Sequence, residues 1–229
     1  MSDWFITFED HRIWWKKNGS SEKKLITEEV YFGLNLIGCI GDWFYFTDIL
    51  LVTYKMNAVY PNTNLIQVEH KIVYGFIEND QLCVVVQEDE NAFSRGYLCK
   101  MEPGTDKLTK LLYNKPFYND VSIYCNREEL THANGWLFFA DEKTIRRMFI
   151  DTSDNTIIYK SAEGSIESLS FNTTDNLIHF CVKIPRQGLG IKVLNVLRWE
   201  IGIRIDYDNF DHKRYAMKLD GSEVRFLGM

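Results

Sequence analysis

Residues 43–48 read WFYFTD, and residues 136–141 repeat the pattern as WLFFAD. Each copy runs into a tight turn and a second short run in which a basic residue precedes methionine, at residues 55–56 and 147–148. Aromatic and β-branched runs favour strands, and a short turn between two of them favours an antiparallel hairpin. The repeated hairpin predicts one β-sheet unit that the chain uses more than once.

Three weaker copies extend the repeat over most of the chain. Met101 and Met217 mark two of them, and Trp15 takes the place of the methionine in the first copy, which begins at residues 4–8. The five anchor residues, at 15, 56, 101, 148 and 217, are 41, 45, 47 and 69 residues apart. Repeats of this length are typical of propeller blades, each of which is a four-stranded sheet.

Most of the chain consists of short aromatic and β-branched runs bounded by Gly, Asn and Asp, without a long stretch of helical periodicity. About 21 strands are expected, close to four in each of five blades. The expected strands are 4–8, 11–16, 23–27, 34–40, 43–48, 50–56, 64–69, 71–77, 81–87, 96–101, 107–113, 120–125, 135–140, 144–150, 156–160, 165–171, 176–183, 190–200, 202–206, 213–219 and 223–227.

The fold class that follows is all-β. We expect a single β-propeller domain over residues 1–229, with five four-stranded blades and six as the alternative. The first copy lacks an innermost strand, because residues 4–8 already form the second strand of the pattern. We therefore expect the C-terminal strand at residues 223–227 to close the ring by pairing near the N-terminus, which would remove the exposed sheet edges.

Two short motifs carry a family resemblance. Residues 45–48, YFTD, resemble the Tyr-Trp-Thr-Asp signature of the low-density lipoprotein receptor type of propeller, and residues 219–222, LDGS, match the turn after the third strand of those blades. The pattern is also similar to uncharacterised bacterial propeller-like domains. The resemblance implies the blade pattern and nothing of receptor function, since receptor propellers of this type have six blades and are extracellular.

Composition narrows the function classes. The formal net charge of −6 argues against a general nucleic-acid binder, which needs a basic face, but leaves a basic protein partner open. The longest uncharged stretch, residues 30–41, is too short to span a membrane, and the first residues do not resemble a secretory signal. We expect a cytoplasmic protein with no membrane contact. The five cysteines, 39, 83, 99, 125 and 181, are expected to be reduced and buried.

Catalytic and metal-binding motifs are weak. The histidines at 11, 70, 132, 179 and 212 show no metal-ligand spacing with each other or with cysteine, and His132 is expected in a loop. Residues 206–211 resemble a calcium loop, but Phe210 replaces an oxygen ligand and the glycine is missing. We therefore assign no catalytic residue, no metal ligand and no cofactor.

Two positions of the repeat, the tryptophan that begins the aromatic strand and the basic residue before the anchor, indicate where these side chains lie in the sheets. The tryptophans at 4, 43 and 136 are equivalent, so we expect core packing between sheets. Lys55, Lys100 and Arg147 precede the anchor in three copies and should share one face of the sheets. That face is either solvated or lines a central channel with basic groups.

Three function classes stay open: a non-enzymatic protein-binding propeller, such as an inhibitor or immunity-type protein; a sugar-binding propeller, in which Trp14 could stack on a sugar ring; and a channel-centred hydrolase, which would need paired carboxylates. We favour the first, because two copies insert long loops, at residues 88–96 and 184–190, and long loops on a rigid scaffold often carry recognition. The candidate contact residues are Phe93, Arg95, Arg186, Gln187 and Trp14.

Overall fold

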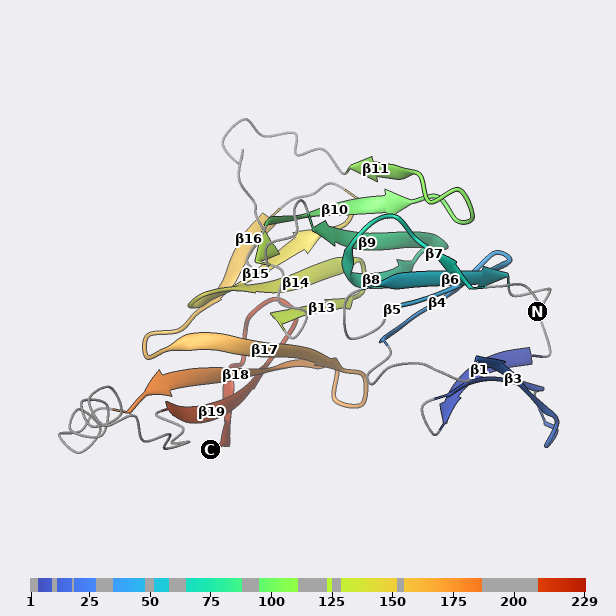
Figure 1. The fold of residues 1–229 in the computed structure, drawn as a ribbon. Coiled ribbons are helices and arrows are strands. Elements are labelled where there is room, and N and C mark those ends of the chain that lie inside the picture. The colour runs from blue at the N-terminus through green and yellow to red at the C-terminus, as the bar shows by residue number, and fades with distance from the viewer. Residues whose placement is uncertain are drawn as a thin grey trace, which may run out of the picture. The chain divides into compact units, whose positions relative to one another are not determined.

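The computed structural model describes residues 4–9, 12–17, 19–27, 35–47, 52–57, 65–87, 95–110, 123–124, 129–151, 155–186 and 210–229. The strands among these residues form five antiparallel sheets in chain order (Figure 1). The described part of the chain contains no helix long and apolar enough to cross a membrane. The chain divides into two compact units, residues 1–125 and 126–229.

The first unit holds three sheets. The first sheet has the order β1-β2-β3 and the second β4-β5-β6-β7, while the third has the order β11-β10-β9-β8 with β12 also paired to β10. The strands are β1 (Trp4–Glu9), β2 (Arg12–Lys17), β3 (Lys23–Thr27), β4 (Asn35–Ile40), β5 (Trp43–Thr47), β6 (Thr53–Asn57), β7 (Ile66–Gln67), β8 (Ile72–Glu78), β9 (Gln81–Gln87), β10 (Arg95–Met101), β11 (Leu108–Lys110) and β12 (Ile123–Tyr124).

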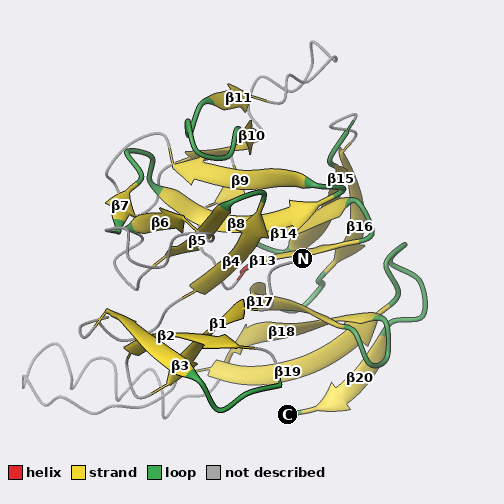
Figure 2. Cartoon of the chain, turned by 90° about the vertical axis from the view of Figure 1, so that its right-hand side faces the viewer, coloured by secondary structure: helices red, strands yellow, loops and turns green. Residues whose placement is uncertain are grey.

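The second unit holds two four-stranded sheets, drawn in yellow with the other strands in Figure 2. Their orders are β13-β14-β15-β16 and β17-β18-β19-β20, so each sheet follows the chain from one edge to the other. The strands are β13 (Leu130–Ala133), β14 (Trp136–Asp141), β15 (Thr144–Phe149), β16 (Asn155–Lys160), β17 (Ser165–Asn172), β18 (Leu177–Pro185), β19 (Phe210–Met217) and β20 (Arg225–Gly228).

The all-β prediction is confirmed, and the four-stranded antiparallel sheets fit a propeller-like fold. The prediction that His132 lies in a loop is wrong, because it belongs to β13, the first strand of the fourth sheet. The predicted strand 120–125 contains β12, which pairs with β10. The predicted strands 190–200 and 202–206 lie outside the described residues.

Ring closure by the C-terminal strand is not confirmed. β20 pairs with β19 and completes the last sheet of the second unit. The first sheet keeps three strands within the described residues, with β1 at one edge beside β2. The three-stranded sheet is the one predicted to lack a strand, but the structure does not show the C-terminal strand filling it.

Neighbouring sheets pack through their first strands in both units. β4 lies against β8 in the first unit, and β13 lies against β17 in the second. Glycine permits the close approach in the first unit, since a Cβ at Gly75 would lie 2.8 Å from Cδ1 of Ile37. The alternating side chains of each sheet can then interdigitate with the next sheet.

Each unit has its own apolar core, built from alternate positions of the strands. The tryptophans of the repeat lie at the edge of these cores: Trp43 and Trp136 are half-buried and pack against the buried residues. This supports the predicted packing role for the two tryptophans whose side chains are described. The buried residues include Tyr45, Ile72, Leu82, Val84 and Met101 in the first unit and Phe138, Ile145, Ile178, Phe180 and Met217 in the second.

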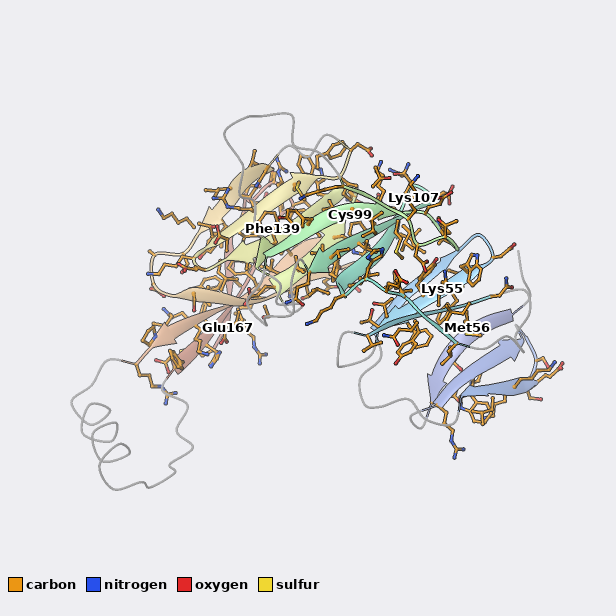
Figure 3. All side chains as sticks on the ribbon, turned by 45° about the horizontal axis from the view of Figure 1, so that its top comes forward. Lys55, Met56, Cys99, Lys107, Phe139 and Glu167 are labelled. Carbon is orange, nitrogen blue, oxygen red and sulfur yellow. The ribbon has the colours of Figure 1, made fainter. Side chains whose placement is uncertain are left out.

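The basic residue before the methionine joins two sheets in the first unit. Lys55, labelled in Figure 3, lies on β6 and reaches the turn between β10 and β11 of the next sheet. Its Nζ donates to the carbonyl of Gly104 and pairs with the carboxylate of Asp106 at 2.6 Å. Tyr45 completes the contact, because its hydroxyl accepts from the Gly104 N–H at 2.8 Å and donates to Asp106 at 3.2 Å.

Arg147 makes the corresponding contact in the second unit. It lies on β15, and its Nη1 donates to the carbonyl of Leu219 at 3.1 Å, in the turn between β19 and β20. Its guanidinium lies 4.4 Å from the ring centroid of Trp136, just as the Lys55 ammonium lies 4.9 Å from that of Trp43. In both units, the basic residue before the methionine therefore links its sheet to the turn that follows the third strand of the next sheet.

This contact corrects the interpretation of the basic residues. Lys55 is buried, with 6% of its side chain exposed, so it does not belong to a solvated strand face. Lys55 and Arg147 each donate a hydrogen bond to a turn of the neighbouring sheet. Both residues therefore join two sheets of their unit, and their charged groups have partners there. Lys100 is half-buried on β10.

The cysteine prediction holds in part. Cys39, Cys83, Cys99 and Cys181 are reduced thiols, while Cys125 lies outside the described residues. Cys83 and Cys99 are buried as expected, but Cys39 is exposed and Cys181 is half-buried. The expectation of uniform burial is wrong because strands have two faces, and a cysteine on the outward face meets solvent.

Candidate functional site

Three side chains with metal-ligating or nucleophilic chemistry meet on the last sheet. Glu167 comes from β17, Cys181 from β18 and His212 from β19. Their ligating atoms lie within 4.8 Å of one another. The Nδ1 of His212 is 2.9 Å from Oε2 of Glu167 and 3.8 Å from Sγ of Cys181. Glu167 is labelled in Figure 3.

Strand register and a bulge bring these residues together. Lys183 pairs with His212 and Cys181 with Arg214, so Cys181 and His212 occupy neighbouring positions on one face. The register of β17 shifts between Ile166 and Ser168, which leaves Glu167 as the extra residue of a bulge opposite β18. Bulges redirect a side chain at the cost of one ladder pair, and they often occur beside functional sites.

The charges around the cluster are mixed. The second carboxylate oxygen of Glu167, Oε1, pairs with Nζ of Lys183 at 2.6 Å. Burial raises the pKa of the Cys181 thiol, the negative charge of Glu167 raises it further, and Arg214 and Lys183 act in the opposite direction. The thiol is therefore protonated at neutral pH.

The geometry does not fit a nucleophilic relay. In a relay, the acid contacts one nitrogen of the histidine ring and the nucleophile contacts the other. Here Glu167 and Cys181 both contact Nδ1 of His212. Three ligand-type atoms within 4.8 Å of one another could instead hold a metal ion, and the raised pKa of the thiol also disfavours attack by a thiolate.

The sequence does not reveal this cluster, because His212 has no cysteine or histidine at metal-ligand spacing along the chain. Its nearest such partner along the chain, Cys181, is 31 residues away. The pairing of β18 with β19 removes that separation. The only sequence signal is the presence of the three residues in predicted or neighbouring strands, and the bulge that presents Glu167 has no recognisable motif.

A second feature of the same sheet is its apolar outer strand. Val224, Phe226 and Leu227, on β20 and just before it, are 42%, 57% and 52% exposed. Phe226 keeps one ring contact with the sheet, at 5.5 Å between centroids from Tyr215. Among the described strands β20 pairs only with β19, so its other edge meets no described strand.

The residues predicted to bind a partner are placed only in part. Arg186 is exposed, and its guanidinium pairs with Asp211 at 2.6 Å where the chain leaves β18 and returns as β19. Arg95 is the first residue of β10, at the end of the predicted loop. Phe93 and Gln187 lie outside the described residues, so their proximity to the others stays a prediction.

Trp14 is half-buried on β2. Its Nε1 donates to the carbonyl of Glu9 at 3.3 Å, and the ammonium of Lys23 lies 4.2 Å from the ring centroid. Glu9 in turn pairs with Lys23 at 3.5 Å. Lys23 lies over one face of the ring, so a sugar stacked on Trp14 would have to use the other face, and this role stays a prediction.

Comparison with known proteins identifies the fold alone. No family model matches the chain, and no curated protein matches it. Solved structures do match, at low identity. They include the hydrazine synthase of Kuenenia stuttgartiensis (10% identity, TM-score 0.55, 96% of this chain and 60% of that one) and a prolyl endopeptidase (8%, TM-score 0.56, 98% and 32%).

The nidogen–laminin complex also matches, at 10% identity and a TM-score of 0.50, over 98% of this chain and 77% of that one. It represents the receptor type of propeller to which residues 45–48 are similar. This chain spans less than two thirds of the hydrazine synthase and prolyl endopeptidase chains. Such different proteins share only a propeller-like fold with it, since one fold carries many functions.

Proposed function

We propose that this chain is a non-enzymatic binding protein that recognises a protein partner. The observation that carries the proposal is the outer strand β20 and the residue just before it, where Val224, Phe226 and Leu227 expose apolar side chains next to a strand edge. An exposed apolar strand edge invites aggregation unless something covers it. An extended segment of a partner would pair with the edge of β20 that meets no described strand, and would cover these side chains.

The other outer strand of this unit offers a contrast. On β16 only Ile157 is a strongly exposed apolar residue, at 52%, and its strand neighbours include Asn155, Thr156 and Lys160. A single exposed apolar side chain is normal on a protein surface. The three exposed apolar residues around Arg225 distinguish β20 from β16, and the net charge of −6 suits a basic partner.

The test compares matched variants at these two strands. Immobilised wild type, Phe226→Lys, Leu227→Lys and Ile157→Lys would each be used to recover partners from native extract. We expect both β20 variants to lose the partner and Ile157→Lys to keep it, with equal melting temperatures as the fold control. Equal recovery by all four folded proteins would reject β20 as the binding surface.

The inserted loops form a second part of the proposed surface. Arg186 and Asp211 hold the base of the connection between β18 and β19, which runs from residue 186 to 209. Phe93 and Arg186 remain candidate contacts, since aromatic and arginine side chains dominate interface energetics. Replacing both with Ala should lower partner recovery without changing the melting temperature; unchanged recovery would limit recognition to β20.

We also propose that the five sheets are the blades of one five-bladed ring. The support is the repeat itself, together with the packing of first strands within each unit and the linking contacts of Lys55 and Arg147. In a ring every sheet depends on its neighbours, so deleting residues 220–229 should abolish the cooperative thermal transition. A sharp, unchanged transition after that deletion would defeat the ring model.

A further inference from the structure

We propose that Glu167, Cys181 and His212 form a binding site for a zinc ion. The three side chains project from adjacent strands of one sheet, and Oε2 of Glu167 and Sγ of Cys181 both converge on Nδ1 of His212. Thiolate, imidazole and carboxylate are the three ligand types that zinc takes from proteins. The site would be independent of the binding surface at β20.

The donor set selects among metals. Calcium and magnesium prefer sites made of oxygen ligands, so a thiolate and an imidazole argue against both. Sulfur and nitrogen donors favour the later first-row metals, and zinc accepts this mixture without a preferred geometry of its own. Three protein ligands leave a fourth tetrahedral position for water or a ligand.

The distances fit a tetrahedral ion with a small adjustment. Ligand atoms bound to zinc at about 2.0 to 2.3 Å stand roughly 3.5 Å apart in a tetrahedron. The separation of Cys181 Sγ from His212 Nδ1 is 3.8 Å, close to that value. The His212–Glu167 pair, at 2.9 Å, would open by about 0.5 Å as the metal takes the place of the shared hydrogen bond.

The charges also balance. A thiolate and a carboxylate together neutralise the two positive charges of zinc, and binding releases the thiol proton to solvent. Lys183 pairs with Oε1 of Glu167, while the other oxygen, Oε2, faces His212. Lys183 can therefore hold the carboxylate in position without occupying the oxygen that would bind the metal, the usual role of an outer-shell partner.

Two of the three ligands sit on regular strands, which limits the freedom of the site. Cys181 and His212 occupy paired strands with continuous register from residue 178 to 185 on β18. The bulge fixes Glu167 opposite them. A site on strands is held more precisely than one on loops, so metal binding needs little reorganisation.

The experiment titrates the purified full chain with Co²⁺ as a spectroscopic probe and then with Zn²⁺ in competition. A thiolate–cobalt complex absorbs in the near ultraviolet, so the wild type should develop this band with one equivalent of metal. Cys181→Ser should lose the band, and His212→Gln and Glu167→Gln should weaken Zn²⁺ binding by more than about tenfold. Cys39→Ser is the matched control, because Cys39 is an exposed thiol of the other unit.

A second readout needs no variant. Zinc should slow the alkylation of Cys181 and leave that of Cys39 unchanged in the same molecule, measured by mass spectrometry of the peptides. The proposal is overturned if the wild type shows no thiolate–cobalt band, if Cys39→Ser loses the band while Cys181→Ser keeps it, or if zinc protects neither or both thiols alike.

Discussion

The two units of this chain join neighbouring sheets at the same position of the repeat but with different chemistry. In residues 1–125, the Lys55 ammonium pairs with a carboxylate, and only 6% of the lysine and 16% of the Asp106 side chain is exposed. In residues 126–229, Arg147 is half-buried and donates to a neutral carbonyl. One unit therefore holds a buried ion pair where the other holds a more exposed hydrogen bond.

The residue beneath the basic side chain explains the difference. Tyr45 lies opposite Lys55 on the neighbouring strand, and Phe138 takes the same place opposite Arg147. The tyrosine hydroxyl binds both Gly104 and Asp106, so the first unit can bury a carboxylate with several partners. A phenylalanine offers no such partner, and in the second unit the acid two residues after the turn glycine, Glu223, pairs instead with Arg225 of its own hairpin.

The repeat therefore preserves a contact between neighbouring sheets, while the charge of the group that the basic side chain meets differs between the two units. A buried charge needs its partners in place, because breaking a buried pair leaves an uncompensated charge. An exposed or half-exposed contact tolerates the loss of one partner, since water replaces it. The two units should therefore respond differently to equivalent substitutions.

The largest effect is expected at the turn glycines. Gly104 and Gly221 both have positive φ, at +84° and +87°. A Cβ at Gly221 would lie 2.2 Å from the carbonyl oxygen of Ile158, whereas one at Gly104 would meet the side chain of Trp43 at 2.6 Å. We expect Gly221→Ala to lower the free energy of unfolding by about 4 kcal/mol and Gly104→Ala to lower it by about 3 kcal/mol. The difference arises because a backbone carbonyl can move away from the new methyl group less easily than a side chain can.

Gly41→Ala provides the control for this pair. Gly41 also has positive φ, at +56°, but a Cβ there would meet nothing within 4 Å. Gly41→Ala should lower the free energy of unfolding by only about 1 kcal/mol, the cost of placing alanine in a backbone conformation with positive φ. Urea denaturation of the three variants measures the differences, and equal losses would show that close packing between sheets adds nothing at the turns.

The next effect separates the two basic residues. Lys55→Met should lower the free energy of unfolding by about 3 kcal/mol, because Asp106 is left buried with fewer partners. Arg147→Met should cost about 1 kcal/mol, the usual worth of a hydrogen bond to a neutral group. Adding Asp106→Asn to Lys55→Met should recover part of the loss. Equal costs in the two units, or no recovery, would contradict the buried-pair account.

Much of the strand pattern could be predicted from the sequence. β3 and β9 begin and end at the predicted residues, because their β-branched and apolar runs are bounded by polar or turn residues. β13 could not be predicted in this way, because its four residues, Leu130–Ala133, include no Phe, Tyr or Trp to mark a strand. The short run at β12 predicts a strand but not its partner, which is β10 of the third sheet.

The linking contacts of Lys55 and Arg147 and the cluster of Glu167, Cys181 and His212 could not be predicted from the strand pattern either. That Lys55 meets Asp106 depends on the packing of one sheet against the next, over 51 residues of chain. The meeting of Glu167 with Cys181 and His212 depends on a bulge that shifts the register at one position. Periodicity in the sequence determines which face a side chain takes, while register and sheet packing decide what it meets.

The smallest effect concerns the hydroxyl that distinguishes Tyr45 from Phe138. Burial, together with the charge of Asp106, raises the pKa of Tyr45 to about 12, while the Gly104 N–H acts in the opposite direction. At neutral pH, Tyr45→Phe should cost about 1 kcal/mol through the lost hydrogen bonds. Phe138 is the natural comparison, because it occupies the equivalent position in the second unit and is also fully buried, but has no hydroxyl.

The cost should shrink as the pH rises. An unfolded tyrosine loses its proton near pH 10, but native Tyr45 keeps it to about pH 12, so in this window the native state binds more protons than the unfolded state. Between pH 10 and 12 the titration of Tyr45 therefore lowers the free energy of unfolding of the wild type by up to about 1.4 kcal/mol per pH unit. The Tyr45→Phe variant has no hydroxyl to titrate and does not show this decrease. Other lysines and tyrosines titrate alike in both proteins, so the difference between their urea midpoints isolates Tyr45. A difference that stays constant from pH 9 to 12 would show that the hydroxyl is not held in the buried network that sets the first unit apart.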